Sequence, residues 1–194
     1  MKIILASASG VRKKILDNYK IESDVVVSNV DEDQIKESLL SENATPLVIS
    51  KNLAEIKSIR VSSKHPDNLV LGADSVISLN NKLINKPKSR KEALEILKEL
   101  NDSKHYLISS VCISKNGAMI WNHTDQSELK MKNLKEDELI QYLDKIKTEI
   151  LLMYGVYQVE AEGINLFEDI KGDKDSIMGL PIKQIMNYIN QYKK

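Results

Sequence analysis

A single aspartate interrupts the apolar run 69–79, and this pattern strongly limits the structure that the segment can adopt. Its sequence, Leu-Val-Leu-Gly-Ala-Asp-Ser-Val-Ile-Ser-Leu, is typical of a buried strand at every position except Asp74. A buried carboxylate is costly unless it is paired, hydrogen-bonded or bound to a cation. We therefore expect Asp74 to belong to a functional site, with the alternative that it only caps a turn at the end of the strand.

Short apolar runs alternate with amphipathic segments along the chain, which indicates an α/β fold. The expected strands are 3–6, 25–27, 69–79, 105–113 and 118–121, with a half-exposed strand at 127–131 and a weak one at 156–159. The expected helices are 11–19, one that opens at Thr45-Pro46, 89–100, 136–146 and one that begins at Pro181. The length suffices for one sizeable core, so we expect a single domain over residues 1–194.

Composition and charge exclude several classes of protein. Lysine and arginine together number 28, as do aspartate and glutamate, so the basic surface of a nucleic-acid-binding domain is not expected. The one cysteine, Cys112, lies in an apolar stretch that suits a reduced structural thiol. No apolar segment approaches the roughly 20 residues that a membrane span requires, and the apolar start is too short for a signal peptide. We expect a cytoplasmic protein.

Polar residues elsewhere in the chain complement Asp74. Ser7, Ser9 and Arg12 follow the first predicted strand, and Glu32 stands at a predicted helix start. Lys57 lies on the helix that opens at Thr45-Pro46, and Lys86 follows the Asp74 strand. Hydroxyls, carboxylates and cations of this kind are what a phosphate site needs. Taken singly, each residue also has a purely structural explanation. The serines would form a turn, the charge of Glu32 would interact favourably with the helix dipole, and the lysines would be solvated on the surface.

Seven short motifs occur in the order found in the Maf family of nucleoside triphosphate pyrophosphatases, and the chain resembles that family over nearly its whole length. Each motif alone is weak, but seven in the right order are hard to obtain by chance. The motifs are Ser7-Ala8-Ser9-Gly10-Val11-Arg12, Val30-Asp31-Glu32, Leu53-Ala54-Glu55-Ile56-Lys57, Gly72-Ala73-Asp74-Ser75, Lys86-Pro87, His105 and Gly179-Leu180-Pro181.

The resemblance implies hydrolysis of a nucleoside triphosphate between its α- and β-phosphates, with a divalent cation, Mg²⁺ or Mn²⁺, as cofactor. Asp74 would accept a proton from the attacking water or orient that water as a metal ligand, and Glu32 would help to hold the metal. The substrate-binding residues implied are Ser7, Ser9, Arg12, Lys57, Ser75, Lys86 and Glu160. The fold implied is a long, curved mixed sheet flanked by helices, with two lobes and a central cleft, similar to inosine triphosphate pyrophosphatases. A homodimer is also implied.

The chain departs from the family pattern at three places. Gly10-Val11-Arg12 replaces the usual Pro-Arg-Arg, so one cation is missing and Arg12 must serve for the pair. Ser75 replaces a threonine and keeps the hydroxyl. Glu160 stands at the position of the glutamine that typifies members acting on dTTP and UTP. A carboxylate can accept hydrogen bonds from N1–H and the exocyclic amine of guanine, which favours 7-methyl-GTP or a related nucleotide.

Three alternatives to a 7-methyl-GTP pyrophosphatase stay open at the level of sequence, one in specificity and two in function. The first is a dTTP/UTP or broad-specificity nucleotide pyrophosphatase. The second is a nucleotide-sensing regulator of cell division with little turnover, which is disfavoured because a pure scaffold has no physical need to assemble Glu32, Lys57, Asp74 and Lys86. The third is a monophosphatase, which is disfavoured because the chain shows no Asp-x-Asp nucleophile motif at a strand end and no histidine cluster.

Overall fold

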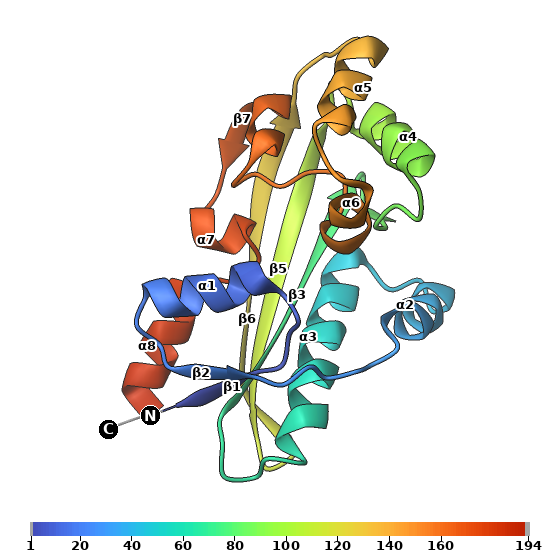
Figure 1. Cartoon of the computed structure of the whole chain (residues 1–194). Coiled ribbons are helices and arrows are strands. Elements are labelled where there is room, and N and C mark those ends of the chain that lie inside the picture. The colour runs from blue at the N-terminus through green and yellow to red at the C-terminus, as the bar shows by residue number, and fades with distance from the viewer. Residues whose placement is uncertain (1, 193–194) are drawn as a thin grey trace.

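The computed structural model describes residues 2–192 and has a mixed sheet flanked by helices (Figure 1), which confirms the α/β prediction. The strands described are β1 (Ile3–Leu5), β2 (Ser23–Val25), β3 (Val70–Leu79), β4 (Lys82–Ile84), β5 (Lys104–Lys115), β6 (Ala118–Met131) and β7 (Phe167–Lys171). The helices described are α1 (Gly10–Asn18), α2 (Glu32–Ser41), α3 (Pro46–Ser62), α4 (Arg90–Leu100), α5 (Glu136–Asp144), α6 (Thr148–Tyr154), α7 (Lys174–Ile177) and α8 (Ile182–Tyr192), with a 3₁₀ helix at Glu162–Leu166. None of these helices has the length and apolar character that a membrane span requires.

The sheet is built on three long antiparallel strands, β3, β5 and β6. Its order is β2-β1-β3-β5-β6-β7, and β1 and β2 run parallel to their neighbours. The turn between β5 and β6 contains Asn116 and Gly117, both at positive φ, as a tight hairpin requires. The predicted strands 118–121 and 127–131 are parts of one strand, β6, because β5 pairs with it along almost its whole length.

One edge of β3 is open at its centre. Strand β1 pairs with β3 only as far as Leu71, and β4 pairs with the same strand from Ile77 onward. The β4 hairpin turns through Asn80 and Asn81, both at positive φ. Residues 72–76, which include Asp74, therefore lie along a gap beyond the carboxyl end of β1, where α/β sheets commonly bind ligands.

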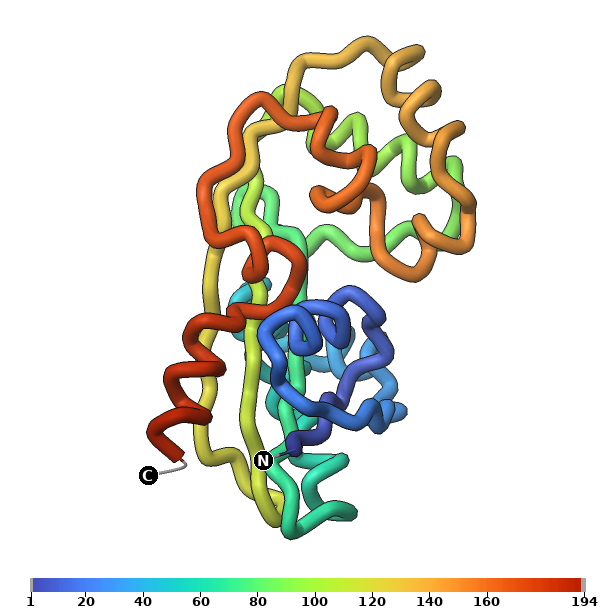
Figure 2. The backbone as a smooth tube through the Cα atoms, turned by 60° about the vertical axis from the view of Figure 1, so that its left-hand side comes forward, coloured from blue at the N-terminus to red at the C-terminus, as the bar shows by residue number. Residues whose placement is uncertain are grey.

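The molecule has two lobes joined by β3, β5 and β6 (Figures 1 and 2). One lobe carries α4, α5, α6 and β7, and its core includes Leu97, Leu129 and Leu139. The other carries α1, α8, β1 and β2, and Leu71 and Ile185 are among the core residues there. This is the predicted two-lobe arrangement of a mixed sheet flanked by helices.

Helix α3 covers the sheet face beside the open edge of β3, and one glycine sets the distance between them. A Cβ at Gly72 would lie 2.2 Å from the carbonyl oxygen of Ala54 and 2.7 Å from the backbone nitrogen of Ser58. Only a residue without a side chain permits this approach. It brings Lys57, which α3 carries between those two contact points, against β3.

Some local predictions were wrong. Segment 156–159, predicted as a weak strand, is a loop without a strand partner, because Val156 and Tyr157 both turn into the core. The strand predicted at 25–27 ends at Val25. Helix α6 and strand β7 were not predicted.

Candidate active site

A cavity of about 530 Å³ lies at the open edge of β3, between the two lobes. Its walls come from the loops that follow β1, β2 and β4, from α2 and α3, and from segments 153–160 and 177–179. The structure brings every predicted site residue to this one cavity: Ser7, Ser9, Arg12, Glu32, Lys57, Asp74, Ser75, Lys86 and Glu160.

Three charged side chains meet at the centre of the cavity. The ammonium of Lys57 lies 2.8 Å from Asp74 Oδ1 and 2.8 Å from Glu32 Oε1. Lys57 and Asp74 are each only 5% exposed. Desolvation raises the pKa of Glu32, but the charge and hydrogen bond of Lys57 outweigh it and hold that pKa below its ordinary value. The Glu32 carboxylate is thus kept in its charged form.

The second carboxylate oxygen of Asp74 is left without a partner. Asp74 Oδ2 is buried and accepts no hydrogen bond from the described residues. An orphaned buried oxygen is costly unless a ligand, a water or an ion satisfies it. Asp74 and Glu32 supply hard oxygen donors of the kind that Mg²⁺ and Mn²⁺ prefer, so the pair fits a divalent cation whose remaining ligands are water or phosphate. No larger cluster of metal-ligating side chains occurs within residues 2–192.

Arg12 is tied to three separate segments of the chain. Its Nε donates to the carbonyl of Gly179, Nη1 donates to Ser7 Oγ and to the carbonyl of Ala73, and Nη2 donates to Ser75 Oγ, each at 3.0 Å. The bond to Ala73 satisfies a carbonyl on the open edge of β3. Burial lowers the pKa of Arg12, against the charges of Asp74 and Glu32. Arg12 therefore builds the cavity wall and uses most of its donors in doing so.

The loop between β1 and α1 forms a polar cradle. Ser9 caps α1, since its hydroxyl accepts the backbone N–H of Arg12 at 3.4 Å. Ser7 Oγ accepts the backbone N–H of Ser9 at 3.3 Å. Free N–H groups at the start of a helix attract anions, so this loop presents an anion-binding surface to the cavity.

Two lysines stand at the rim. Lys86 donates to the carbonyl of Met153 at 2.8 Å and so bridges the β4–α4 loop to the end of α6. Desolvation lowers the pKa of Lys86, opposed by the charges of Glu32 and Asp74. Lys36 also lines the cavity and was missed at the level of sequence. The signal was its spacing, because Lys36 is four residues after Glu32 and so lies on the same side of α2.

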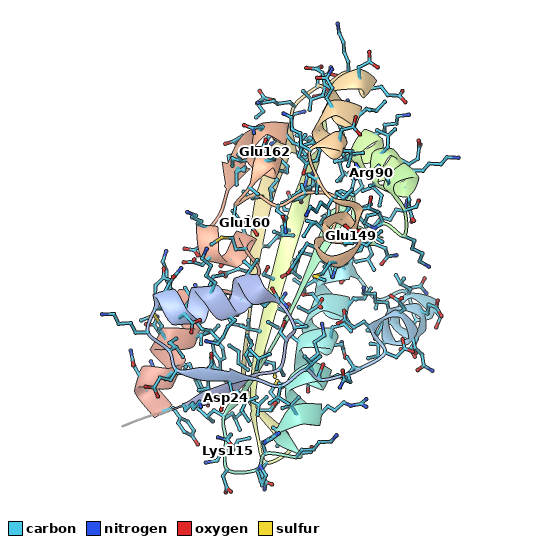
Figure 3. The ribbon with its side chains drawn as sticks, viewed as in Figure 1. Asp24, Arg90, Lys115, Glu149, Glu160 and Glu162 are labelled. Carbon is cyan, nitrogen blue, oxygen red and sulfur yellow. The ribbon has the colours of Figure 1, made fainter. Side chains whose placement is uncertain are left out.

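The far end of the cavity is formed by the loop that follows α6. Gly155 ends α6 at a φ of 100°, and Gly163 packs so closely that a Cβ there would lie 2.5 Å from the carbonyl oxygen of Gln158. Tyr157 fixes the loop to the core, where its hydroxyl is 2.8 Å from Nε2 of the buried His105. Glu160 is exposed on this loop (Figure 3). The carboxylate of Glu160 is thus on the opposite lobe from the β1–α1 cradle.

Comparisons with known proteins identify the family of this chain. The family model described as Maf-like protein matches residues 2–192. A nucleoside triphosphate pyrophosphatase of Pelagibacter ubique is 58% identical over 99% of this chain and 98% of its own length. Another from Ruegeria pomeroyi is 36% identical over 96% of this chain and 94% of its own length. A 7-methyl-GTP pyrophosphatase of Rhizobium etli is 33% identical over 98% of this chain and 96% of its own length.

Among solved structures, a HAM1 protein from Coxiella burnetii is similar with a TM-score of 0.47 at 13% identity. The match covers 69% of this chain and 74% of that one.

Proposed function

This chain belongs to the Maf-like family and is an enzyme of the nucleoside triphosphate pyrophosphatase class, and from that premise we propose that it hydrolyses the α–β phosphoanhydride of a guanine-type nucleotide, 7-methyl-GTP or a close relative. The products are a nucleoside monophosphate and pyrophosphate. The observation that carries the proposal is the pair of carboxylates, Glu32 and Asp74, that share the ammonium of Lys57 inside a cavity lined by further cations.

The reaction needs an oriented water and neutralised phosphate oxygens more than it needs covalent catalysis. Asp74 and Glu32 would hold a Mg²⁺ or Mn²⁺ ion, whose charge would offset that of the phosphates. The unpartnered Oδ2 of Asp74 would either take the proton of the attacking water or, as a metal ligand, orient that water. Lys57 fixes the other oxygen of Asp74 and so holds the carboxylate in one orientation.

The triphosphate has a polar cradle to bind. Ser7 and Ser9, just before α1, line one side of the cavity, and Lys86 stands at the rim of the other. Lys86 is exposed, so exchanging the Met153 carbonyl for a phosphate oxygen requires little rearrangement. In the bond cleavage, water oxygen attacks the α-phosphorus and the bond to the α–β bridging oxygen breaks, so that pyrophosphate leaves.

The preference for a guanine-type base rests on Glu160. Its carboxylate accepts two hydrogen bonds and donates none, which suits guanine N1–H and the exocyclic amine and does not suit the two acceptors of uracil or thymine. Glu160 lines the cavity on the lobe opposite the phosphate cradle, where the base of a bound nucleotide would lie. The similarity to the 7-methyl-GTP pyrophosphatase of Rhizobium etli supports the same assignment.

The test is pyrophosphate release by the purified protein with Mg²⁺ or Mn²⁺ from dTTP, UTP, CTP, GTP and 7-methyl-GTP. We expect the highest kcat/KM with 7-methyl-GTP. A preference for dTTP and UTP would overturn the base assignment and keep the reaction. No release from any of the five would overturn the proposed reaction and favour a nucleotide sensor.

A pair of variants isolates the base contact. Glu160→Gln should lower kcat/KM for 7-methyl-GTP by about 10-fold or more, the effect of one charge-assisted hydrogen bond, and should raise the relative rate with dTTP and UTP. Glu162→Gln is the matched control, because Glu162 follows closely, at the start of the 3₁₀ helix, but does not line this cavity (Figure 3). Equal effects of the two substitutions would remove Glu160 from base recognition.

A further inference from the structure

We propose that Lys36 is a further substrate-binding residue, whose ammonium holds the pyrophosphate part of the nucleotide, the part that leaves. This inference rests on the proposed function, since it assigns a place to one portion of that substrate. Lys36 is half-buried on α2 and lines the active-site cavity.

The cations around the cavity differ in how many of their N–H donors are already hydrogen-bonded within the protein. Arg12 makes four hydrogen bonds within the protein, Lys57 is shared by two carboxylates, and Lys86 donates to the carbonyl of Met153. Lys36 acts on its neighbour Glu32 through charge without donating a hydrogen bond to it, whereas Lys57 does both. Within residues 2–192, Lys36 is thus the cavity-lining cation whose ammonium makes no hydrogen bond to another residue.

The position of Lys36 is set by α2. Asp31 caps this helix, Glu32 is its first residue, and Lys36 follows one turn later on the same side. The charge of Lys36 contributes to lowering the pKa of Glu32, after the larger effects of desolvation and Lys57, and its like charge also lowers that of Lys86. Lys36 therefore shares one side of α2 with the carboxylate that we place at the reacting phosphates, and both residues line the cavity.

The substrate can be laid across the cavity in one direction. The base lies toward Glu160 on the loop after α6, and the reacting phosphorus lies at Asp74 and Glu32. Phosphates beyond the cleaved bond then continue past Glu32 along α2, where Lys36 stands.

The absence of a positive charge at position 11 explains why this chain needs one at position 36. Val11 lines the cavity at a position where the resemblance to the Maf family leads one to expect an arginine. With Arg12 committed to Ser7, Ser75 and two carbonyls, the leaving pyrophosphate would otherwise have few free donors. Lys36 supplies the missing positive charge from another element.

The first test measures affinity directly. Calorimetric binding of inorganic pyrophosphate with Mg²⁺ is compared for the wild-type protein, Lys36→Ala, Lys36→Arg and Lys51→Ala. Lys51 is the matched control, since it is an exposed helical lysine that does not line the cavity. We expect Lys36→Ala to weaken pyrophosphate binding by about 10-fold or more, Lys36→Arg to restore most of it, and Lys51→Ala to match the wild type.

The second test separates the two ends of the substrate. Lys36→Ala should raise the inhibition constant of pyrophosphate and the KM of the triphosphate, and should leave inhibition by the monophosphate product within about twofold of wild type, because a charge-assisted contact made only to the leaving group is lost. Unchanged pyrophosphate affinity in Lys36→Ala, or an equal loss for both products, would overturn the proposal. Pyrophosphate binding that depends on Lys36 in a protein without turnover would overturn the proposed reaction and leave this site standing.

Discussion

The ammonium of Lys57 contacts Asp74 Oδ1 at 2.8 Å, and both residues are almost completely buried. Lys57 also contacts Glu32 at 2.8 Å, so one positive charge is shared by two carboxylates. The trio carries a net negative charge on a cavity wall, with Asp74 Oδ2 unpartnered. We expect this arrangement to attract a divalent cation, and the contact with Lys57 holds the Asp74 carboxylate in one orientation.

Asp74→Asn should abolish most turnover while preserving the fold. The amide keeps an oxygen that can accept from Lys57, but it has lost the charge and the basicity, so kcat should fall by about 10²- to 10⁴-fold. The measurement is steady-state pyrophosphate release, with circular dichroism as the check on folding. Asp67→Asn, an exposed carboxylate outside the cavity, is the control and should keep wild-type kcat. Unchanged turnover in Asp74→Asn would remove this residue from the mechanism.

Lys57→Met should destabilise the protein more than most surface changes do. It leaves the Asp74 carboxylate buried without a counter-charge, which costs about 3–5 kcal/mol in the free energy of unfolding at neutral pH. Urea denaturation measures the loss. The double variant Lys57→Met/Asp74→Asn should recover a large part of it, because the uncompensated charge is then absent. Additive losses in the double variant would contradict the ion pair as their cause.

Local chemistry explains which parts of the fold could be predicted from the sequence. Thr45-Pro46 indicates a helix start, and α3 does begin at Pro46, with the Thr45 hydroxyl accepting the N–H of Val48 at 3.4 Å. The helix predicted over 89–100 starts as expected, since the Ser89 hydroxyl accepts the backbone N–H of Glu92 at 3.1 Å, and the Glu92 carboxylate accepts the backbone N–H of Lys88 at 2.8 Å. Segment 156–159 has the composition of a strand, but no neighbouring strand is available to pair with it.

The ordered motifs predicted which residues share one site, but they did not predict the hydrogen bonds that those residues make. The partners of Arg12 are as far away in sequence as Gly179, so no local pattern could show that this guanidinium is already hydrogen-bonded. Lys36 belongs to none of the motifs, and only its spacing from Glu32 points to it in the sequence. Residue type and spacing thus predicted the composition of the site, and tertiary packing decides which donors remain free for a ligand.

Gly72→Ala should disrupt the contact between α3 and β3. The new Cβ would lie 2.2 Å from the carbonyl oxygen of Ala54, which is backbone and cannot swing aside. We expect a loss of about 3 kcal/mol in the free energy of unfolding, and a fall in kcat because Lys57 moves with α3. Gly10→Ala is the control, since nothing lies within 4 Å of a Cβ built there. Thermal and urea unfolding of both variants are the measurements, and equal stabilities would show that α3 can shift at little cost.

His105 should make the protein sensitive to mild acid. Its side chain is fully buried, Nε2 is 2.8 Å from the Tyr157 hydroxyl and Nδ1 has no partner among the described residues. Burial lowers the pKa of His105 to about 4, whereas a histidine in the unfolded chain has a pKa of about 6.5. Between these values the unfolded chain binds the extra proton, so stability is present at neutral pH and is lost as the pH falls from about 6.5 toward 4.

For a pKa that shifts over this range, the loss of unfolding free energy between pH 7.5 and pH 5 is about 2 kcal/mol. His105→Gln removes the titrating group, so the difference in unfolding free energy between the two pH values should shrink by that amount, whatever the stability of the variant at pH 7.5. His65→Asn, in a loop outside the cavity, should keep the full wild-type difference. Urea denaturation of the three proteins at both pH values decides the matter, because an undiminished acid loss in His105→Gln would assign it to other groups.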